Sequence, residues 1–305
     1  MTAPGRLDVH AHYVPDGYRA ALERAGHDQP DGFPWIPAWS AEDHVQVMDR
    51  LGIERSLLSV SSPGVHLAGV DTADLAREVN EEGRRGVVGH PGRFGLLGSL
   101  PLPDVDAAIA EIAHCADHLD VDGFVLLTNV DGTYVGDTSF EPVLRELDRR
   151  AARVLLHPTS PPCWEHTSFD RPRPMVEFLF DTTRAVVDLV LNGTVARHAA
   201  LRIIVPHAGA VLPLVAERVN AFGALLAPEV DVLRDLGRLH FDLAGHAVPR
   251  QLDALLTMTT PDHLHYGSDF PFTPEPVAAA AAERLDSLAD ALRANTARLF
   301  ERTSR

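Results

Sequence analysis

Two histidines near the start of the chain, His10 and His12, are separated by one residue in the segment DVHAH. On a β-strand, residues i and i+2 point to the same side, so both imidazoles can reach one point in space. Imidazole nitrogen is a common protein ligand for zinc and other divalent transition metals. An H-x-H pair can arise by chance in a chain with 16 histidines. Its place at the carboxyl end of the first predicted strand strengthens the signal for a metal site.

Three further polar residues follow apolar runs in the same way. His157 ends VLLH, His207 follows RIIVP, and Asp269 follows HYGS. If these runs are parallel strands of one barrel, their carboxyl ends lie on the face where barrel enzymes build their active sites. Together with the H-x-H pair, they supply three or four ligands and a spare base, which is the composition of a catalytic metal site with an open position.

The elements that must position these residues are read from the hydrophobic pattern. Nearly continuous apolar runs alternate with amphipathic segments. Such runs are expected for parallel strands that are buried on both faces. The predicted strands are Arg6–His10, Arg55–Val60, Phe94–Leu100, Gly123–Leu127, Arg153–His157, Arg202–Pro206, Leu239–Leu243 and His263–Gly267. The predicted helices are Ala41–Leu51, Ala73–Arg85, Val105–His118, Glu141–Arg150, Met175–Leu191 and Val211–Phe222, with Ser40 and Asp104 as N-caps. This alternation predicts a single α/β domain over residues 1–305, a (β/α)8 TIM barrel, with an open doubly wound sheet as the alternative.

Two long segments interrupt the alternation. Tyr13–Ser40 follows the first predicted strand and is rich in aromatic residues, and Pro158–Pro174 follows the fifth. Long loops after barrel strands are typical substrate walls, so we expect the first to act as a lid, with Trp35 and Trp39 beside the substrate. His66, near the end of the second strand, faces the same end of the barrel and is a further candidate contact.

Composition excludes several classes of chemistry. The chain has no lysine, so it cannot form a Schiff-base nucleophile, a GxxxxGK[ST] phosphate loop or a carbamylated lysine bridging two metals. A formal charge of −16 argues against nucleic acid or an anionic membrane as partners. Two cysteines, no signal-peptide pattern and no long apolar run lead us to expect a cytoplasmic protein.

Seven longer motifs carry a family resemblance. They are RLDVHAHYVP, SVSSPGVH, PGRFGLLGSLPLPDVD, VLLHPTSPP, RPMVEFLFDTTRAV, VPHAGAVLP and YGSDFPFTP. The chain resembles the amidohydrolase superfamily from about residue 5 to residue 300, in the branch of aminocarboxymuconate-semialdehyde decarboxylase. Within that branch it is most similar to 6-methylsalicylate decarboxylase-like proteins.

The resemblance implies roles for these residues. His10, His12, His157 and Asp269 would bind one metal ion per subunit, and Asp269 and His207 would be catalytic. The ligand types suit Zn²⁺, with Mn²⁺ as the alternative. The branch forms homodimers, and Arg218 matches an arginine that reaches the substrate carboxylate of the neighbouring subunit.

The implied activity is the non-oxidative decarboxylation of a 2-hydroxybenzoate-type aromatic acid, by protonation of a ring carbon and then loss of CO2. The alternative is a metal-dependent hydrolase or cyclodehydratase acting on an aromatic ester, lactone or amide in secondary metabolism, because the same ligands also support those reactions. A non-enzymatic scaffold protein would be expected to have lost at least one of the ligands, and none is missing.

Overall fold

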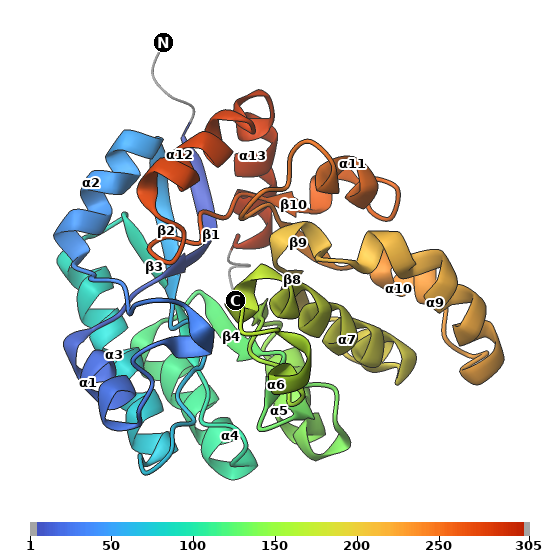
Figure 1. Cartoon of the computed structure of the whole chain (residues 1–305), viewed down its shortest axis with the longest axis horizontal. Helices are drawn as coiled ribbons and strands as arrows, with labels where there is room; N and C mark the ends of the chain where they lie inside the picture. The colour runs from blue at the N-terminus through green and yellow to red at the C-terminus, as the bar shows by residue number, and fades with distance from the viewer. Residues whose placement is uncertain (1–4, 302–305) are drawn as a thin grey trace.

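The computed structural model describes residues 5–301, and its centre is a sheet of eight parallel strands (Figure 1). The strands follow one another around the sheet in the order β1 (Arg6–His12), β2 (Ile53–Ser59), β3 (Phe94–Ser99), β4 (Gly123–Leu127), β7 (Arg153–His157), β8 (Arg202–Val205), β9 (His240–Asp242) and β10 (Leu264–His265). Every predicted strand is present within a few residues of its expected bounds. The predicted (β/α)8 barrel is therefore confirmed.

The sheet closes where its first and last strands meet. Asp8 and Tyr266 form a parallel bridge, and the Val9 amide donates a hydrogen bond of 2.9 Å to the Tyr266 carbonyl. Beyond the end of β10, the Asp269 amide donates to the His10 carbonyl over 2.7 Å. The seam of the barrel thus brings the H-x-H pair and Asp269 together through the backbone, although they lie at opposite ends of the chain.

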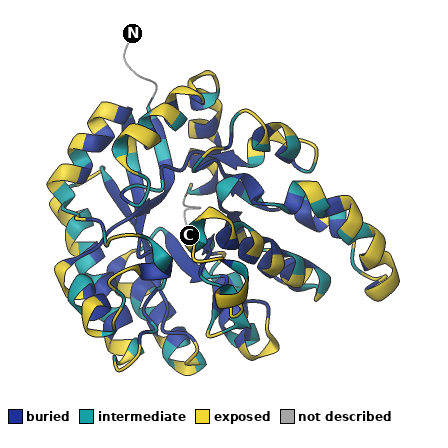
Figure 2. Cartoon of the chain, in the orientation of Figure 1, coloured by how far each residue is buried: buried dark blue, intermediate teal, exposed yellow. Residues whose placement is uncertain are grey.

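Apolar side chains fill the inside of the barrel. One buried cluster takes one residue from each of six neighbouring strands and one leucine from the last helix: Val9, Leu57, Leu97, Val125, Leu155, Ile204 and Leu299. This layer occupies the barrel axis, as expected for small parallel barrels. A second, larger cluster fills the space between strands and helices. In Figure 2 the strands are accordingly buried, whereas the helices expose their outer faces.

The helices surround the sheet (Figure 1). They are α1 (Asp16–Arg24), α2 (Ala41–Leu51), α3 (Thr72–Gly89), α4 (Val105–His114), α5 (Glu141–Arg149), α6 (Trp164–Thr167), α7 (Glu177–Leu191), α8 (Thr194–Arg197), α9 (Leu212–Leu226), α10 (Val232–Gly237), α11 (Gln251–Leu255), α12 (Glu275–Glu283) and α13 (Ala289–Leu299). Ser40 and Asp104 cap α2 and α4 as predicted, because their side chains accept hydrogen bonds from the Asp43 and Ala107 amides. The predicted helix 105–118 changes at Cys115 into a π-helical turn, Cys115–Leu119.

The segment Tyr13–Ser40 is not a continuous loop, because it contains α1 and a 3₁₀ turn at Pro30–Gly32. Helix α1 buries Tyr18, Ala21 and Leu22, which are spaced three and one residues apart on one face. That short amphipathic pattern was concealed by the many glycines, prolines and aromatic residues around it. No helix within residues 5–301 is both long and apolar enough to cross a membrane.

Candidate metal centre

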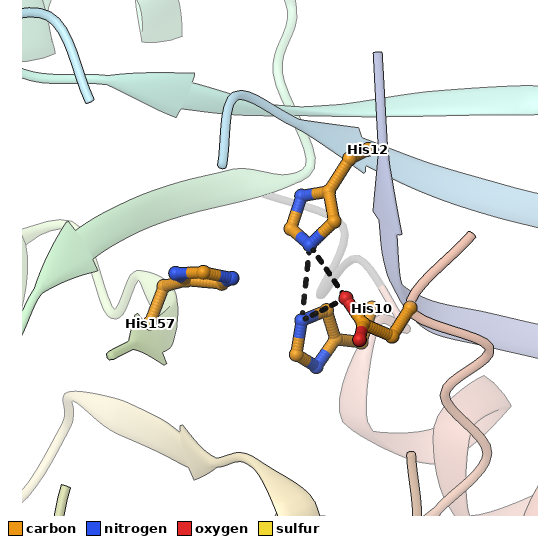
Figure 3. Close-up of side chains that lie close together, drawn as sticks. His10, His12 and His157 are labelled. Atoms are coloured by element: carbon orange, nitrogen blue, oxygen red, sulfur yellow. Dashed lines mark hydrogen bonds and ion pairs between the residues drawn. The ribbon is translucent and has the colours of Figure 1, made fainter. Parts of the chain in front are cut away.

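Four side chains from β1, β7 and the segment after β10 converge at the carboxyl end of the barrel. One ligand atom from each of His10, His12, His157 and Asp269 lies within 4.8 Å of the others. The Nε2 atoms of His10 and His12 are 3.2 Å apart, and Asp269 Oδ1 lies 3.6 Å and 3.2 Å from them, respectively. Figure 3 shows the three imidazoles facing a common space from β1 and β7.

Each histidine directs Nδ1 away from that space and toward an acceptor. His10 Nδ1 lies 2.9 Å from Asp242 Oδ2, and His157 Nδ1 lies 2.8 Å from the Pro158 carbonyl. His12 Nδ1 lies 3.2 Å from the Ser59 carbonyl. Carbonyl oxygens only accept hydrogen bonds, so Nδ1 carries the proton in His12 and His157. The Nε2 lone pairs are therefore free to bind a cation, and such outer partners are usual for metal-bound histidines.

The electrostatics of the cluster favour a positive charge at its centre. Burial lowers the pKa of His10, but the charge and hydrogen bond of Asp242, with Asp269 and Asp8, outweigh it and raise the pKa to about 9. Burial lowers the pKa values of His12 and His157, so both rings are neutral. Two Nε2 lone pairs at 3.2 Å repel each other unless a proton or metal ion lies between them. The residues present thus fit a single divalent ion.

Asp269 is held as a carboxylate. Burial by itself would raise its pKa, but the close contact with His12 and the charge of His10 hold the pKa well below the usual range of an aspartate. Thr273 Oγ1 donates to its second oxygen, Oδ2, over 2.9 Å. The backbone at Asp269 has φ of +56°, an uncommon conformation for a non-glycine residue and one that functional sites often retain.

His207 lies beside the four-residue group and is not part of it. Its ring centroid is 5.3 Å from that of His10, and its buried Nδ1 has no hydrogen-bond partner among the described residues. Its own backbone is left-handed, with φ of +54°, and its amide donates to Asp242 Oδ1 over 3.1 Å. Burial lowers the pKa of His207, so the ring is a neutral base.

A cavity of about 450 Å³ opens onto the cluster. His157, His207 and Asp269 form part of its lining, and its walls are largely apolar. The aromatic walls are Phe33, Phe178 and Phe272. Phe272 lies edge-on to His12 at 5.5 Å, and Phe178 lies edge-on to His157 at 6.4 Å. A flat aromatic molecule could therefore contact both phenylalanines while facing the metal ligands.

The structure does not bring the two predicted tryptophans into this cavity. Trp35 is half-exposed and contacts Phe33 from outside, with ring centroids 5.1 Å apart. Trp39 packs against Tyr13, and its indole N–H donates to His44 Nδ1. The aromatic residues of the lining are instead Phe33, from the same loop, and Phe178 and Phe272, which follow other strands.

His66 and Arg218 also lie apart from the cavity of this chain. His66 lines a separate small pocket and binds Thr72 Oγ1 and Asp131 Oδ2, each at 3.0 Å. Arg218 is exposed on α9, with its guanidinium 5.2 Å from the Phe222 ring centroid. A role for Arg218 in the site of a second subunit stays a prediction.

Sequence reasoning missed Asp242 and Asp31. Asp242 is fully buried at the end of β9 and binds both His10 and the His207 amide. The signal that identified His157, a polar residue ending an apolar strand, is present at Asp242 too. Asp31 lines the cavity from the first loop, where no strand pattern marks it.

Comparisons with known proteins agree with this arrangement. The family model for amidohydrolases matches residues 7–303. The chain belongs to the amidohydrolase family. A 6-methylsalicylic acid decarboxylase from Aspergillus aculeatus is 33% identical to this amidohydrolase over 98% of the chain and 97% of its own length.

Solved structures share the fold. A protein called amidohydrolase II has a TM-score of 0.92 at 32% identity, covering 97% of this chain and 99% of that one. A dihydroxybenzoic acid decarboxylase from a Polaromonas species, solved with manganese and the inhibitor 2-nitroresorcinol, has a TM-score of 0.81 at 20% identity, covering 97% and 96%. At that identity the second likeness shows the fold alone.

Proposed function

We propose that this amidohydrolase is a metal-dependent, non-oxidative decarboxylase of 2-hydroxybenzoate-type aromatic acids, with a 6-methylsalicylate-like substrate. The observation that supports this is the cavity, whose lining combines His157, Asp269 and His207 with three phenylalanines. The Aspergillus aculeatus relative, named for 6-methylsalicylic acid, supports the choice of substrate.

The cofactor would be one divalent ion per subunit, held by His10, His12, His157 and Asp269. Three imidazoles and one carboxylate suit Zn²⁺, and Mn²⁺ is the alternative. When bound, the ion would act as a Lewis acid toward the phenolic oxygen and neutralise charge on the substrate. Asp242 would fix the His10 ring and keep Nδ1 protonated through its 2.9 Å contact.

Asp269 would transfer a proton from oxygen to carbon. Direct loss of CO2 would leave a carbanion in the ring plane, which the aromatic π system cannot stabilise. The low pKa of Asp269 means that it begins as a base, so it would take the proton of the phenolic hydroxyl. It would then deliver that proton to the ring carbon that bears the carboxylate. The bond to the carboxylate breaks, its electrons restore the aromatic ring, and CO2 leaves.

His207 would position the leaving carboxylate. Its unpartnered Nδ1 is buried next to His10, at the metal end of the cavity. An imidazole N–H there can hydrogen-bond the carboxylate while the aromatic walls exclude water from the ring carbon. The segment 13–40 would act as the lid, since Pro30, Asp31 and Phe33 form part of the cavity wall.

The working form would be a cytoplasmic homodimer in which Arg218 approaches the neighbouring site. Helix α9 exposes Leu214, Phe222, Leu225 and Leu226, an apolar surface of the kind that subunits bury. Arg218 lies on the same helix, so a partner that covers α9 would also meet its guanidinium.

The experiment that tests the function supplies the metal-loaded protein with 6-methylsalicylate and, separately, with aryl esters. We expect wild-type protein to release CO2 and 3-methylphenol from the acid. The His10→Ala variant should release neither. Ester hydrolysis or cyclisation without CO2 release would overturn the proposal in favour of hydrolase chemistry.

A further inference from the structure

The segment that carries His207 has an unusual backbone. Four successive residues, His207, Ala208, Gly209 and Ala210, have positive φ angles of 54°, 52°, 75° and 55°. Glycine adopts such angles at little cost, but the other three residues are strained by them. Strained conformations of this kind persist only where the surrounding structure holds them in place. The contacts made by residues 207–210, here called the 207–210 turn, therefore determine where the His207 imidazole lies.

The side-chain amide of Gln251 holds both ends of this turn. Gln251 Nε2 donates to the His207 carbonyl over 2.8 Å and to the Ala210 carbonyl over 3.2 Å. Both N–H groups of the amide are used in this way, and because carbonyl oxygens only accept hydrogen bonds, they fix which way the amide faces. One side chain thus joins the first and last residues of the 207–210 turn.

Helix α11 also packs against the turn. Gln251 is the first residue of α11 and Leu255 is the last, four positions later, so both lie on the same side of the helix. Leu255 is fully buried, and a Cβ placed on Gly209 would lie only 3.3 Å from Leu255 Cδ1. The apolar contact in the middle of the turn therefore fixes the helix from which the Gln251 amide reaches the two ends.

His207 is held by hydrogen bonds to its backbone and not to its buried Nδ1. Its amide donates to Asp242 Oδ1 over 3.1 Å. Its carbonyl accepts from the Ala210 amide over 2.9 Å, in addition to Gln251. Nδ1 of the ring has no hydrogen-bond partner in the described part of the chain. The position of the ring therefore depends on the backbone that carries it, and loss of a backbone contact should displace the ring.

We propose that Gln251 is a positioning residue for His207, which fixes the imidazole beside the metal ligands by holding the 207–210 turn. This inference rests on the proposed function, in which His207 meets the leaving carboxylate. A displacement of about 1 Å at a reacting group can cost roughly 100-fold in rate. Gln251 also belongs to the cavity lining, so direct contact with the substrate is the alternative that the experiments must exclude.

Gln251→Met is the first test. Methionine has nearly the same length as glutamine but no N–H group, so α11 can still pack while both carbonyls lose their donor. We expect kcat to fall about 10- to 100-fold and KM to stay within about threefold. Metal affinity, measured by competition with a chelator, should not change, because His207 is outside the four-residue group. A raised KM with wild-type kcat would assign Gln251 to substrate binding and overturn the proposal.

Gln251→Glu keeps the size of the side chain and removes both donors. Its carboxylate repels the two carbonyl oxygens, so kcat should fall at least as far as in Gln251→Met. Gln46→Glu makes the same chemical change at an exposed position of α2 and should behave as wild type. Wild-type kcat in Gln251→Glu would show that the two hydrogen bonds do not matter for the reaction.

A double variant shows whether Gln251 acts through His207. When Gln251→Met is added to His207→Asn, kcat should change by less than about threefold, because the ring that Gln251 positions is already absent. If the double variant instead loses the full 10- to 100-fold again, Gln251 acts independently of His207 and the proposal is wrong.

The Ala210 amide reports on the turn without any turnover. It donates to the His207 carbonyl, so its hydrogen exchanges with solvent when the turn opens. In Gln251→Met this exchange, measured by NMR, should be about 10-fold faster or more, while the amides of β3 keep their wild-type rates. Unchanged exchange at Ala210 would mean that Gln251 does not hold the turn.

The two kinds of measurement separate this inference from the proposed function. Faster exchange at Ala210 in Gln251→Met, with no CO2 released from any 2-hydroxybenzoate by wild type, would support the hold on the turn while refuting the decarboxylase. Decarboxylation by wild type, with wild-type kcat and exchange in Gln251→Met, would do the reverse.

Discussion

Asp242 Oδ2 lies 2.9 Å from His10 Nδ1, and both side chains are completely buried. The other Asp242 oxygen accepts hydrogen bonds from the His207 and Ala244 amides, at 3.1 Å and 3.0 Å. One carboxylate therefore orients the ring of His10, a proposed metal ligand, and the backbone of His207, the proposed base. Burial would raise the pKa of Asp242, but His10 holds it below the usual range, so the charge is kept.

Replacing Asp242 with asparagine should weaken metal binding by about 10- to 100-fold. The amide group can donate to His10 Nδ1, which moves the ring proton to Nε2 and blocks the ligating lone pair. Competition with a chelator of known affinity measures the change, and Asp253→Asn, at an exposed position of α11, is the control. Unchanged metal affinity would show that Asp242 does not set the tautomer.

Replacing His207 with asparagine should lower kcat by roughly 10²- to 10⁴-fold and leave the metal content unchanged. Asparagine is suited to the left-handed backbone at this position, so the fold should survive. Metal analysis and steady-state kinetics are made on the same sample, with the exposed His166→Asn as control. If the metal is lost along with activity, His207 is a ligand and not a base.

If Arg218 reaches the substrate carboxylate of a neighbouring subunit as proposed, replacing it with alanine should raise KM about 10-fold with a smaller effect on kcat, because that charged contact would be lost. Sedimentation of wild type and variant must show the proposed dimer in both. Arg145→Ala, an exposed arginine on α5, should behave as wild type. Normal KM in a dimeric Arg218→Ala protein would remove Arg218 from the site.

Acid should destabilise the barrel through His265. Burial lowers its pKa to about 3, and the neighbouring His240 contributes. The unfolded chain has the ordinary value near 6.5, so below that pH the unfolded state binds more protons than the folded state. The contribution of the neutral His265 ring to the free energy of unfolding is complete above about pH 6.5 and decreases as the pH falls toward 3. At pH 5 up to about 2 kcal/mol of this contribution is lost.

Thermal unfolding at pH 7 and pH 5 measures this loss. In His265→Gln the decrease in Tm between the two pH values should be smaller than in wild type, even if the variant is less stable at pH 7. The exposed His166→Gln should show the wild-type decrease. The same decrease in His265→Gln would mean that other groups govern acid unfolding.

The strands and the convergence of the three histidines and Asp269 could be predicted because they share one physical cause. A strand buried on both faces is apolar along its length, so a polar residue at its carboxyl end, such as His157, is conspicuous. Asp242 follows the same rule and could have been found by it. The cavity walls could not, because the positions of Phe178 and Phe272 depend on how separate segments pack, which has no sequence period.

The first long loop shows this limit most clearly. Trp35 and Phe33 are two residues apart and similar in type, yet only Phe33 lines the cavity. Both residues follow the left-handed backbone at Asp31 and Gly32. The aromatic composition of the loop predicted a cavity wall, but no sequence period indicates which of the two rings faces the cavity.

The seam between β1 and β10 also has a consequence for biosynthesis. A nascent chain that ends at residue 262 has already made His10, His12 and His157, but it lacks β10 and Asp269. Its first strand then has no partner along one edge, and its ligand set has no carboxylate. If the four residues bind a metal ion as proposed, metal capture and ring closure should coincide, only after the last strand has left the ribosome.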